Sequence, residues 1–204
     1  METEDMTVHK TGTTTVGLVT TGGVVLAADR RASLGGRFVS NKQSQKIEHV
    51  HPSAAVTMSG SVGGGQAFIR RLRSEADLYE VRRGEPMSME ALARTAGHLI
   101  RGTASMPLLG GVDEEGPRVF EIDGAGGVLE DTYAASGSGT SLATGALERL
   151  YHEDLTLSEG VSVAASAVDS AMERDTASGN GITVARITAE DVTMESYDSL
   201  TEVH

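Results

Sequence analysis

The spacing of apolar residues along the 204-residue chain changes several times between short runs and a three-and-four period. Short runs and alternation predict strands, and the longer period predicts amphipathic helices. The first predicted strands cover residues 13–19, 24–28, 37–40, 46–50 and 54–58. Helical patterns follow over about 66–82 and 89–101, and further strands over 108–112, 118–122 and 128–134. Two more helices are predicted over about 141–151 and 156–174, and two more strands over 181–187 and 192–197.

Polar residues mark where two of these helices begin. Ser88 directly precedes the second helical pattern and suits an N-cap, because its hydroxyl can accept a hydrogen bond from a free backbone N–H. Thr156 and Glu159 have the spacing of a capping box at the start of the fourth helix.

The predicted strands occur in groups that are separated by pairs of helices. A doubly wound parallel sheet would instead alternate single strands with single helices. The order favours an α+β fold in which two antiparallel sheets lie between two helix pairs, a four-layer α-β-β-α sandwich. No internal repeat or linker interrupts residues 13–204, so we expect one domain after a short polar leader, residues 1–12.

Composition excludes several kinds of chemistry. The chain has no Cys, which excludes disulfides, thiolate nucleophiles and cysteine zinc sites. It has no apolar run long enough to cross a membrane, and its acidic first residues lack the apolar region of a secretory signal. We therefore expect a cytoplasmic protein without a membrane partner.

The charge balance is strongly acidic, with a formal net charge of -12. Phosphate backbones repel such a chain, so nucleic acid is not an expected partner. Only three of the 17 basic residues are Lys, namely Lys10, Lys42 and Lys46. An acidic, lysine-poor surface is typical of proteins from a salt-rich cytoplasm. Where Lys is so scarce, Lys46 draws attention, because a Lys can lose its proton when its surroundings shift its pKa and Arg effectively cannot.

Residues 11–17 (TGTTTVG) begin the first strand and contain the strongest candidate nucleophile. A cut between Gly12 and Thr13 would give Thr13 a free α-amine with a reference pKa of roughly 7.7–8.0. One residue would then hold both a nucleophilic hydroxyl and its base. The simpler interpretation is that three β-branched residues only start a strand.

Three further residues could complete such a site. Gly60 follows a predicted buried strand at the start of a helix, where unpaired backbone N–H groups can form an oxyanion hole. Lys46 could reach the start of the first strand, and Asp29 at the end of the first hairpin could hold its ammonium group. Each also has an ordinary interpretation, Gly60 and Asp29 as turn residues and Lys46 as a solvated strand residue.

Other motifs are weaker. His49 and His51 alternate along a strand and could share a metal, but no third ligand is placed near them. The glycine-rich stretches 60–65 and 136–140 precede helices, yet neither has the ending of a P-loop or the spacing of a dinucleotide site. Neither contains Gly-x-Ser-x-Gly, so a serine nucleophile elbow is not supported.

Taken together, the ordered motifs of the chain resemble those of proteasome β-subunits, especially the archaeal type. The resemblance covers residues 13 to about 197 and rests on these segments: 13–17 (TTTVG), 27–31 (AADRR), 46–47 (KI), 58–60 (MSG), 134–139 (AASGSG) and 174–179 (RDTASG). It implies the N-terminal-nucleophile hydrolase fold, which agrees with the four-layer pattern. It also implies a threonine endopeptidase without a cofactor or metal.

The resemblance implies a role for each matching residue. Thr13 is the nucleophile after autocatalytic removal of residues 1–12 at the Gly12–Thr13 bond. Lys46 lies beside Thr13 and stays charged, Asp29 pairs with Lys46, and the Gly60 N–H binds the oxyanion. Ser138, Asp175 and Ser178 form a hydrogen-bonded support around the Thr13 amine.

The substrate contacts follow in the same way. Ser33 and Gly60 would flank the substrate backbone, which adds to the site as an extra strand. Ala32, Met58 and Val62 map near the pocket for the residue before the cut, so the resemblance implies a preference for large apolar residues. The bend between Ser33 and Lys46 is about one residue longer than in some relatives, so Gln45 competes with Lys46 for the lysine position. We choose Lys46, because glutamine carries no charge.

The implied partners are α-subunits and other β-subunits in stacked seven-membered rings, a regulatory unfolding ATPase, and unfolded polypeptide substrates. Three alternatives remain: a catalytically silent ring subunit, the related bacterial peptidase ring, and a nucleotide-binding protein. Silent subunits usually lack the threonine or the lysine, and both are present here. The bacterial ring lacks the Arg-Asp-Thr-Ala-Ser-Gly segment, and no glycine loop here ends in the lysine that nucleotide binding requires.

Overall fold

The computed structural model describes residues 12–203. Its strands are β1 (Thr14–Thr20), β2 (Gly23–Asp29), β3 (Ala32–Leu34), β4 (Phe38–Asn41), β5 (Ile47–His51), β6 (Ala54–Thr57), β7 (Leu108–Asp113), β8 (Gly116–Ile122), β9 (Val128–Asp131), β10 (Tyr133–Gly137), β11 (Ile182–Ile187) and β12 (Val192–Tyr197). Its helices are α1 (Val62–Arg83), α2 (Met89–Ile100), α3 (Thr140–Leu150), α4 (Leu157–Met172) and the 3₁₀-helix η1 (Leu200–Glu202).

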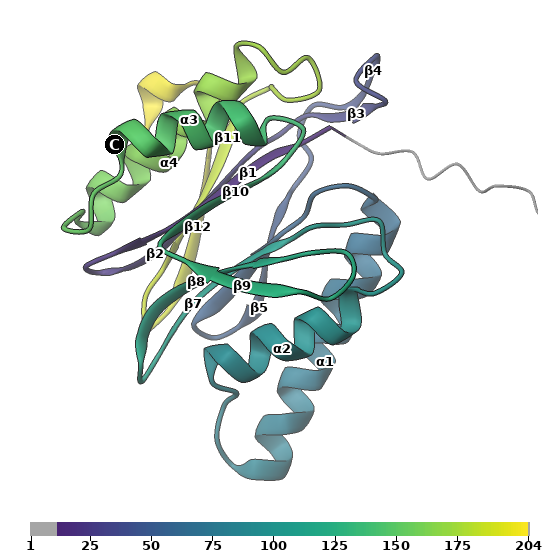
Figure 1. Ribbon diagram of the computed structural model, residues 1–204, viewed down its shortest axis with the longest axis vertical. Coiled ribbons are helices and arrows are strands. Elements are labelled where there is room, and N and C mark those ends of the chain that lie inside the picture. Colours follow the sequence, from purple (N-terminus) through teal and green to yellow (C-terminus); the bar gives the residue numbers. More distant parts are fainter. Residues whose placement is uncertain (1–11, 204) are drawn as a thin grey trace, which may run out of the picture.

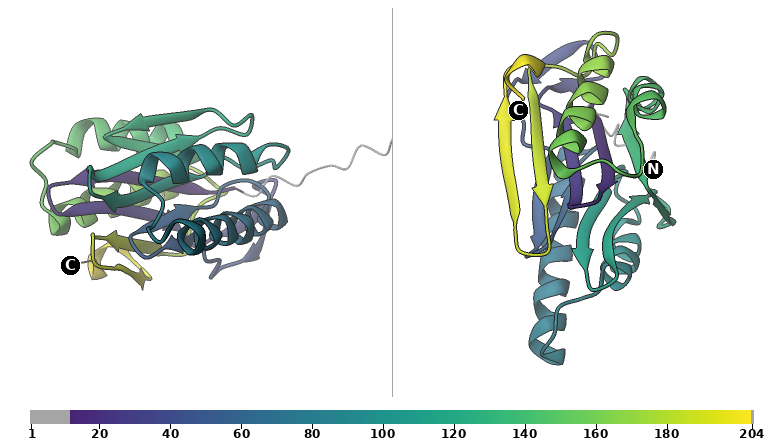
Figure 2. Two further views of the ribbon diagram at one scale, coloured as in Figure 1. Left: turned by 90° about the horizontal axis from the view of Figure 1, so that it is seen from below. Right: turned by 90° about the vertical axis from the view of Figure 1, so that its left-hand side faces the viewer.

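Two five-stranded antiparallel sheets form the centre of the molecule. The first has the strand order β10-β1-β2-β11-β12, and the second has the order β5-β6-β7-β8-β9. Helices α3 and α4 cover the outer face of the first sheet, and α1 and α2 cover the outer face of the second (Figure 1). The turned views show the same helix pairs on opposite sides (Figure 2). The predicted four-layer sandwich is therefore confirmed.

Strand β2 shows why the layers stack as they do. Val25 and Ala27 join the cluster that packs against α4, whereas Val24, Leu26 and Ala28 join the cluster between the two sheets. Successive side chains of a strand point to opposite faces, so a run that is apolar at every position is buried on both sides. All seven residues of β2 are buried, as its continuous apolar run predicted.

Helix α1 begins one turn earlier than the predicted start near residue 66. Three consecutive glycines disfavour helix in isolation, which is why the sequence pattern placed the start after them. In the structure Ser61 is the N-cap, and its Oγ accepts a hydrogen bond from the Gly64 N–H at 3.3 Å. Gly65 packs so closely on Met58 that a Cβ there would lie 2.9 Å from its Sδ.

The caps predicted for two other helices are confirmed. Ser88 is the N-cap of α2 and accepts a hydrogen bond from Ala91 N–H. Thr156 and Glu159 form both hydrogen bonds of the capping box that starts α4.

The single strand predicted over 128–134 is wrong, because the chain changes sheets within it. β9 pairs with β8 in the second sheet, whereas β10 pairs with β1 in the first. Thr132 lies between them, and its carbonyl accepts a hydrogen bond from Val19 N–H at 2.8 Å. The short strand β3 is absent from the sequence prediction; it pairs with β4 in a hairpin outside the two main sheets. Within residues 12–203, no helix is long and apolar enough to cross a membrane.

The two histidines of β5 do not share a face. The β5–β6 pairing shifts register between His49 and His51, so His49 is exposed and His51 is buried. In the described part of the chain, no group of three or more metal-ligating side chains is arranged to hold an ion. The histidine pair therefore loses its only support as a metal site.

His51 instead makes a pH-dependent contribution to stability. Its Nε2 atom is buried and has no hydrogen-bond partner among the described residues. Burial lowers the pKa of His51, and nearby Glu80 opposes this shift. The unfolded chain then binds a proton more readily than the folded one below about pH 6.5, the reference value for His. Stability should fall as the pH drops through that range.

We predict that the melting temperature of His51→Asn falls less than that of the unmodified protein when the pH is lowered from about 7.5 to about 5.5. The comparison uses thermal unfolding at constant salt, with His49→Asn as the matched control on the same strand. Equal pH dependence of the unmodified protein and His51→Asn would contradict this account.

Candidate functional site

Two cavities lie on either side of the bond between Gly12 and Thr13. The first cavity, about 430 Å³, includes Thr13 in its lining. The second cavity, about 560 Å³, includes Gly12. Ser59 and Gly60 line both. The segment that the sequence singled out therefore separates two hollows that together could hold an extended chain.

Thr13 is held at the start of β1 and is only 2% exposed. Its Oγ1 donates a hydrogen bond to the carbonyl oxygen of Gly12 at 2.7 Å. Its backbone N–H donates to Ser138 Oγ at 3.1 Å. In the uncut chain this nitrogen is an amide, so it becomes a base only when the Gly12–Thr13 bond is broken.

A buried ion pair lies next to this bond. Lys46 Nζ is 2.7 Å from Asp29 Oδ1, and the two side chains are 5% and 0% exposed. The same Nζ lies 3.4 Å from the Gly12 carbonyl oxygen. Gln45, the competing residue, donates its side-chain amide to the Ile47 carbonyl instead. The geometry thus favours Lys46 over Gln45 as the residue next to Thr13.

Four donors surround the Asp29 carboxylate. Oδ1 accepts hydrogen bonds from Lys46 and from Thr14 N–H at 2.8 Å. Oδ2 accepts from Arg31 N–H at 3.0 Å and from Gly179 N–H at 2.8 Å. This set of donors gives hydrogen-bond partners to both oxygens of a fully buried carboxylate.

The ammonium group of Lys46 is under opposing influences. Burial lowers the pKa of Lys46, whereas the Asp29 charge and hydrogen bond raise it. The net direction is downward, so Lys46 releases its proton more readily than a solvated lysine does.

A second hydrogen-bonded cluster contacts the backbone nitrogen of Thr13 and the side chain of Thr14. Asp175 Oδ2 accepts hydrogen bonds from Ser138 Oγ at 2.5 Å and from Ser178 Oγ at 2.6 Å. Each serine hydroxyl has one proton, which it donates in its hydrogen bond to Asp175. The serine oxygen is then left to act as an acceptor. Ser138 then accepts from Thr13 N–H, and Ser178 accepts from Thr14 Oγ1–H at 2.8 Å.

The glycine-rich stretches contribute to this packing and do not form phosphate loops. Residues 63–65 belong to the first turns of α1. Gly137 has φ +101°, and a Cβ there would lie 2.0 Å from the Thr13 carbonyl oxygen. A Cβ at Gly139 would meet Thr14 Oγ1 at 2.0 Å. The 136–140 stretch instead packs on the start of β1 and lines the second cavity through Ser136, Gly137, Ser138 and Thr140.

The predicted substrate contacts lie around the same bond. Ala32, Met58 and Val62 all line the first cavity with Thr13. Ser33 Oγ accepts a hydrogen bond from Gly12 N–H at 3.2 Å. The first cavity is more polar than expected, since it also includes the following residues: Ser40, Asn41, Gln43, Ser44, Gln45, Glu48, Ser61 and Gln66.

Comparison with known proteins identifies the family of this chain. Residues 9–187 match the family model described as "Proteasome subunit". A "Proteasome subunit beta" of Halomicrobium mukohataei is 61% identical over 194 residues, which cover 94% of this chain and 82% of that protein. A "Proteasome subunit beta 2" of Haloarcula marismortui is 59% identical, with coverage of 96% and 86%. The chain belongs to the proteasome β-subunit family.

The source organisms of the relatives fit the unusual composition of this chain. A third relative, from Halorhabdus utahensis, is 57% identical, and these sources are halophilic archaea. This agrees with the acidic, lysine-poor composition of the present β-subunit. Members of the family form the rings of the proteasome core particle, a protease, together with α-subunits. The match decides against the nucleotide-binding interpretation and favours the proteasome over the bacterial peptidase ring.

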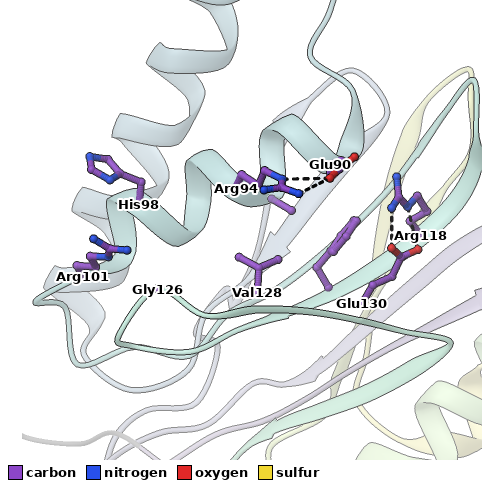
Figure 3. Close-up of a pocket in the computed structure, with 10 residues that line it drawn as sticks. Glu90, Arg94, His98, Arg101, Arg118, Gly126, Val128 and Glu130 are labelled. Carbon is purple, nitrogen blue, oxygen red and sulfur yellow. Dashed lines mark hydrogen bonds and ion pairs between the residues drawn. The ribbon is translucent and has the colours of Figure 1, made fainter.

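A cavity of similar size lies elsewhere on this β-subunit, between α2 and strands β8 and β9 (Figure 3). It measures about 480 Å³. Its charges are largely paired, Glu90 with Arg94 and Arg118 with Glu130. Its lining contains no Ser, Thr, Lys or Asp, so it lacks a nucleophile next to a base. Side-chain chemistry, more than cavity size, distinguishes the candidate site.

Two residues near the site were not assigned a role from the sequence. Thr14 was expected to be an ordinary strand residue, yet it bonds Ser178 through its side chain and Asp29 through its N–H. Arg31 contacts the segment that carries Asp175 and Ser178. Strand propensity and turn signals describe backbone conformation, so neither contact has a signature in the local sequence.

We predict that Asp29→Asn destabilises this β-subunit by about 3–5 kcal/mol, because it leaves the Lys46 charge buried without its partner. The amide NH₂ would also face donors that now point at a carboxylate. Urea unfolding at constant high salt measures the loss.

The double variant Asp29→Asn, Lys46→Met removes both charges and should recover part of that stability. If Asp29→Asn unfolds at the same urea concentration as the unmodified subunit, leaving the Lys46 charge without its partner has no cost in stability, and the prediction is wrong.

Proposed function

We propose that this β-subunit is a threonine endopeptidase of the proteasome core particle and cleaves unfolded polypeptides to peptides. The observation that carries the proposal is the position of Thr13. Its hydroxyl donates a hydrogen bond to the carbonyl oxygen of the preceding Gly12. The same oxygen is next to Lys46 of the buried Asp29–Lys46 pair. A threonine that only started a strand would need neither a buried lysine nor a preceding glycine.

The first reaction in this proposal is self-cleavage. Thr13 Oγ attacks the carbonyl carbon of Gly12, the hydroxyl proton passes to the Thr13 nitrogen, the Gly12–Thr13 C–N bond breaks, and an ester forms between Gly12 and Thr13 Oγ. Water hydrolyses the ester, which releases residues 1–12 and leaves Thr13 with a free α-amine. Of these leader residues, 1–11 lie outside the described part of the chain.

The new amine then acts as the base for substrate cleavage. Directly or through a water, it takes the Thr13 hydroxyl proton as the oxygen attacks a substrate carbonyl. It returns a proton to the leaving amine, and water releases the acyl group. Ser138, which contacts the Thr13 nitrogen in the uncut chain, would support the amine together with Asp175 and Ser178.

Gly60 is assigned the oxyanion contact. It lies after β6, immediately before the N-cap of α1, and lines both cavities. A backbone N–H beside a helix N-terminus is suited to negative charge. One such donor is worth roughly 3–4 kcal/mol in comparable sites.

The proposal includes the assembly in which the reaction takes place. β-Subunits and α-subunits would form stacked seven-membered rings in the cytoplasm, and an unfolding ATPase would deliver substrates through the α-rings. No cofactor takes part in the steps proposed, because Thr13 supplies the nucleophile and the base.

We predict that Thr13→Ala and Lys46→Ala each abolish self-cleavage and peptide hydrolysis while the subunit still folds. Release of a fluorescent group from short peptides by the assembled particle measures activity, and gel mobility measures loss of residues 1–12. Lys42→Ala, at the exposed lysine nearest in the sequence, is the matched control and should keep full activity.

Normal turnover by Lys46→Ala would overturn the assignment of that lysine. Equal activity of the unmodified protein and Thr13→Ala would support the alternative that this is a catalytically silent structural β-ring subunit.

For specificity, we predict a chymotrypsin-like preference for large apolar residues before the cut. Ala32, Met58 and Val62 supply the small or apolar part of the first cavity. Glu48, the acidic group there, is paired with Arg73 at 2.8 Å and is therefore less available to a basic side chain. Rates on peptides that differ only in this residue test the preference, and equal or faster cleavage after Arg or Lys would refute it.

A further inference from the structure

The segment of residues 175–181 carries two members of the candidate site and is held from outside by one side chain. Arg31 Nε donates a hydrogen bond to Asn180 Oδ1 at 2.9 Å, and its Nη1 donates to the Thr176 carbonyl at 2.9 Å. The two bonds span the part of the segment that contains Ser178. Arg31 itself lies between β2 and β3, far away in the sequence.

The backbone of this segment has little tolerance for movement. Gly179 has φ +154°, and Asn180 has φ +67°, in the left-handed region that non-glycine residues rarely occupy. The Arg31 guanidinium lies directly on Gly179, where a Cβ would come within 2.4 Å of Nη2. The planar guanidinium group therefore covers the turn and makes hydrogen bonds to residues on both sides of Gly179.

The backbone of Arg31 joins the same segment to the ion pair. The N–H groups of Arg31 and Gly179 both donate to Asp29 Oδ2. Arg31 thus contacts the Asp29 carboxylate through its main chain and the Asp175–Ser178 turn through its side chain. Asp29 in turn accepts a hydrogen bond from Thr14 N–H, and Asp175 accepts one from Ser138, which contacts the Thr13 nitrogen.

We infer that Arg31 is a positioning residue that holds the 175–181 segment, and with it Asp175 and Ser178, in register with Asp29 and Lys46. The inference rests on the proposed threonine-peptidase function. Arg31 lines neither cavity, so it acts on the site through these contacts and through its charge. Burial is the main cause of the lowered pKa of Lys46, and the positive charge of Arg31 adds to it, whereas Asp29 and Asp175 oppose it.

The experiment compares Arg31→Met, Arg31→Lys and the control Arg37→Met in the assembled particle. Arg37 is exposed and lies in the neighbouring hairpin. The readouts are kcat, KM and the alkaline limb of the pH–rate profile on one short peptide. Thr13→Ala is measured in parallel.

Arg31→Met should lower kcat by about tenfold or more, because misplaced groups lose catalytic alignment, while KM changes by less than twofold. Its alkaline limb should move to higher pH, because loss of the Arg31 charge removes one of the influences that lower the pKa of Lys46, and the proposed mechanism needs that lysine charged beside Thr13. Arg31→Lys keeps the positive charge but loses the planar guanidinium group that makes both hydrogen bonds. Its alkaline limb should therefore match the unmodified protein, with kcat between the two.

A kcat and an alkaline limb for Arg31→Met that equal those of Arg37→Met would overturn the inference. If Arg31→Met fails to assemble, Arg31→Lys and Asn180→Ala test the inference instead. Each removes part of the hydrogen bonding between Arg31 and the 175–181 segment, so each should lower kcat without moving the alkaline limb. Unchanged kcat in both variants would refute the inference. If Thr13→Ala is fully active, the proposed function itself fails. If Thr13→Ala is inactive and the Arg31 variants are unaffected, only the role of Arg31 fails.

Discussion

The site depends on one buried interaction, the ion pair between Asp29 and Lys46. Transfer of each charge out of water costs several kcal/mol, and the pair is tolerated because the two charges face each other and further hydrogen bonds reach the Asp29 carboxylate. Asp29 lies at the end of β2 in the first sheet, and Lys46 immediately precedes β5 of the second. Thr14, Arg31 and Gly179 supply the remaining donors. The ion pair therefore links the two sheets at the place where β1 begins.

This arrangement places the candidate site at one end of the sandwich. The interior between the sheets is apolar, with Val24, Leu26 and Ile47 among its residues. Polar groups become frequent where β1 and β2 leave that interior, and there each has a partner: Thr15 Oγ1 accepts from Thr57, and Ser59 and Ser136 share the Met106 carbonyl. A fully hydrogen-bonded cluster of this kind fixes side-chain positions before a substrate arrives.

Much of the fold could be predicted from local pattern, and the failures have identifiable causes. Strands such as β2 and helices such as α4 were found because their apolar periodicity matches their burial. The division between β9 and β10 was missed because the propensities on either side of Thr132 are alike and only tertiary pairing separates them. The start of α1 was misplaced because the cap at Ser61 outweighs the weak propensity of three glycines.

The site was less accessible to local reasoning. Thr13, Asp29, Lys46 and Gly60 each had an ordinary interpretation, and only the resemblance to a family joined them before the structure brought them together. Ser138, Asp175 and Ser178 had no signal of their own apart from that resemblance. The side-chain hydrogen bonds of Thr14 to Ser178 and of Arg31 to Thr176 and Asn180 join residues more than 140 positions apart in the chain, which no local pattern encodes.

The central claim is that Thr13 becomes the first residue of the working subunit. Intact mass spectrometry of the subunit taken from the purified, assembled particle tests it most directly. The account predicts a mass that begins at Thr13. A mass that retains residues 1–12 in the assembled ring would contradict it and indicate an inactive subunit.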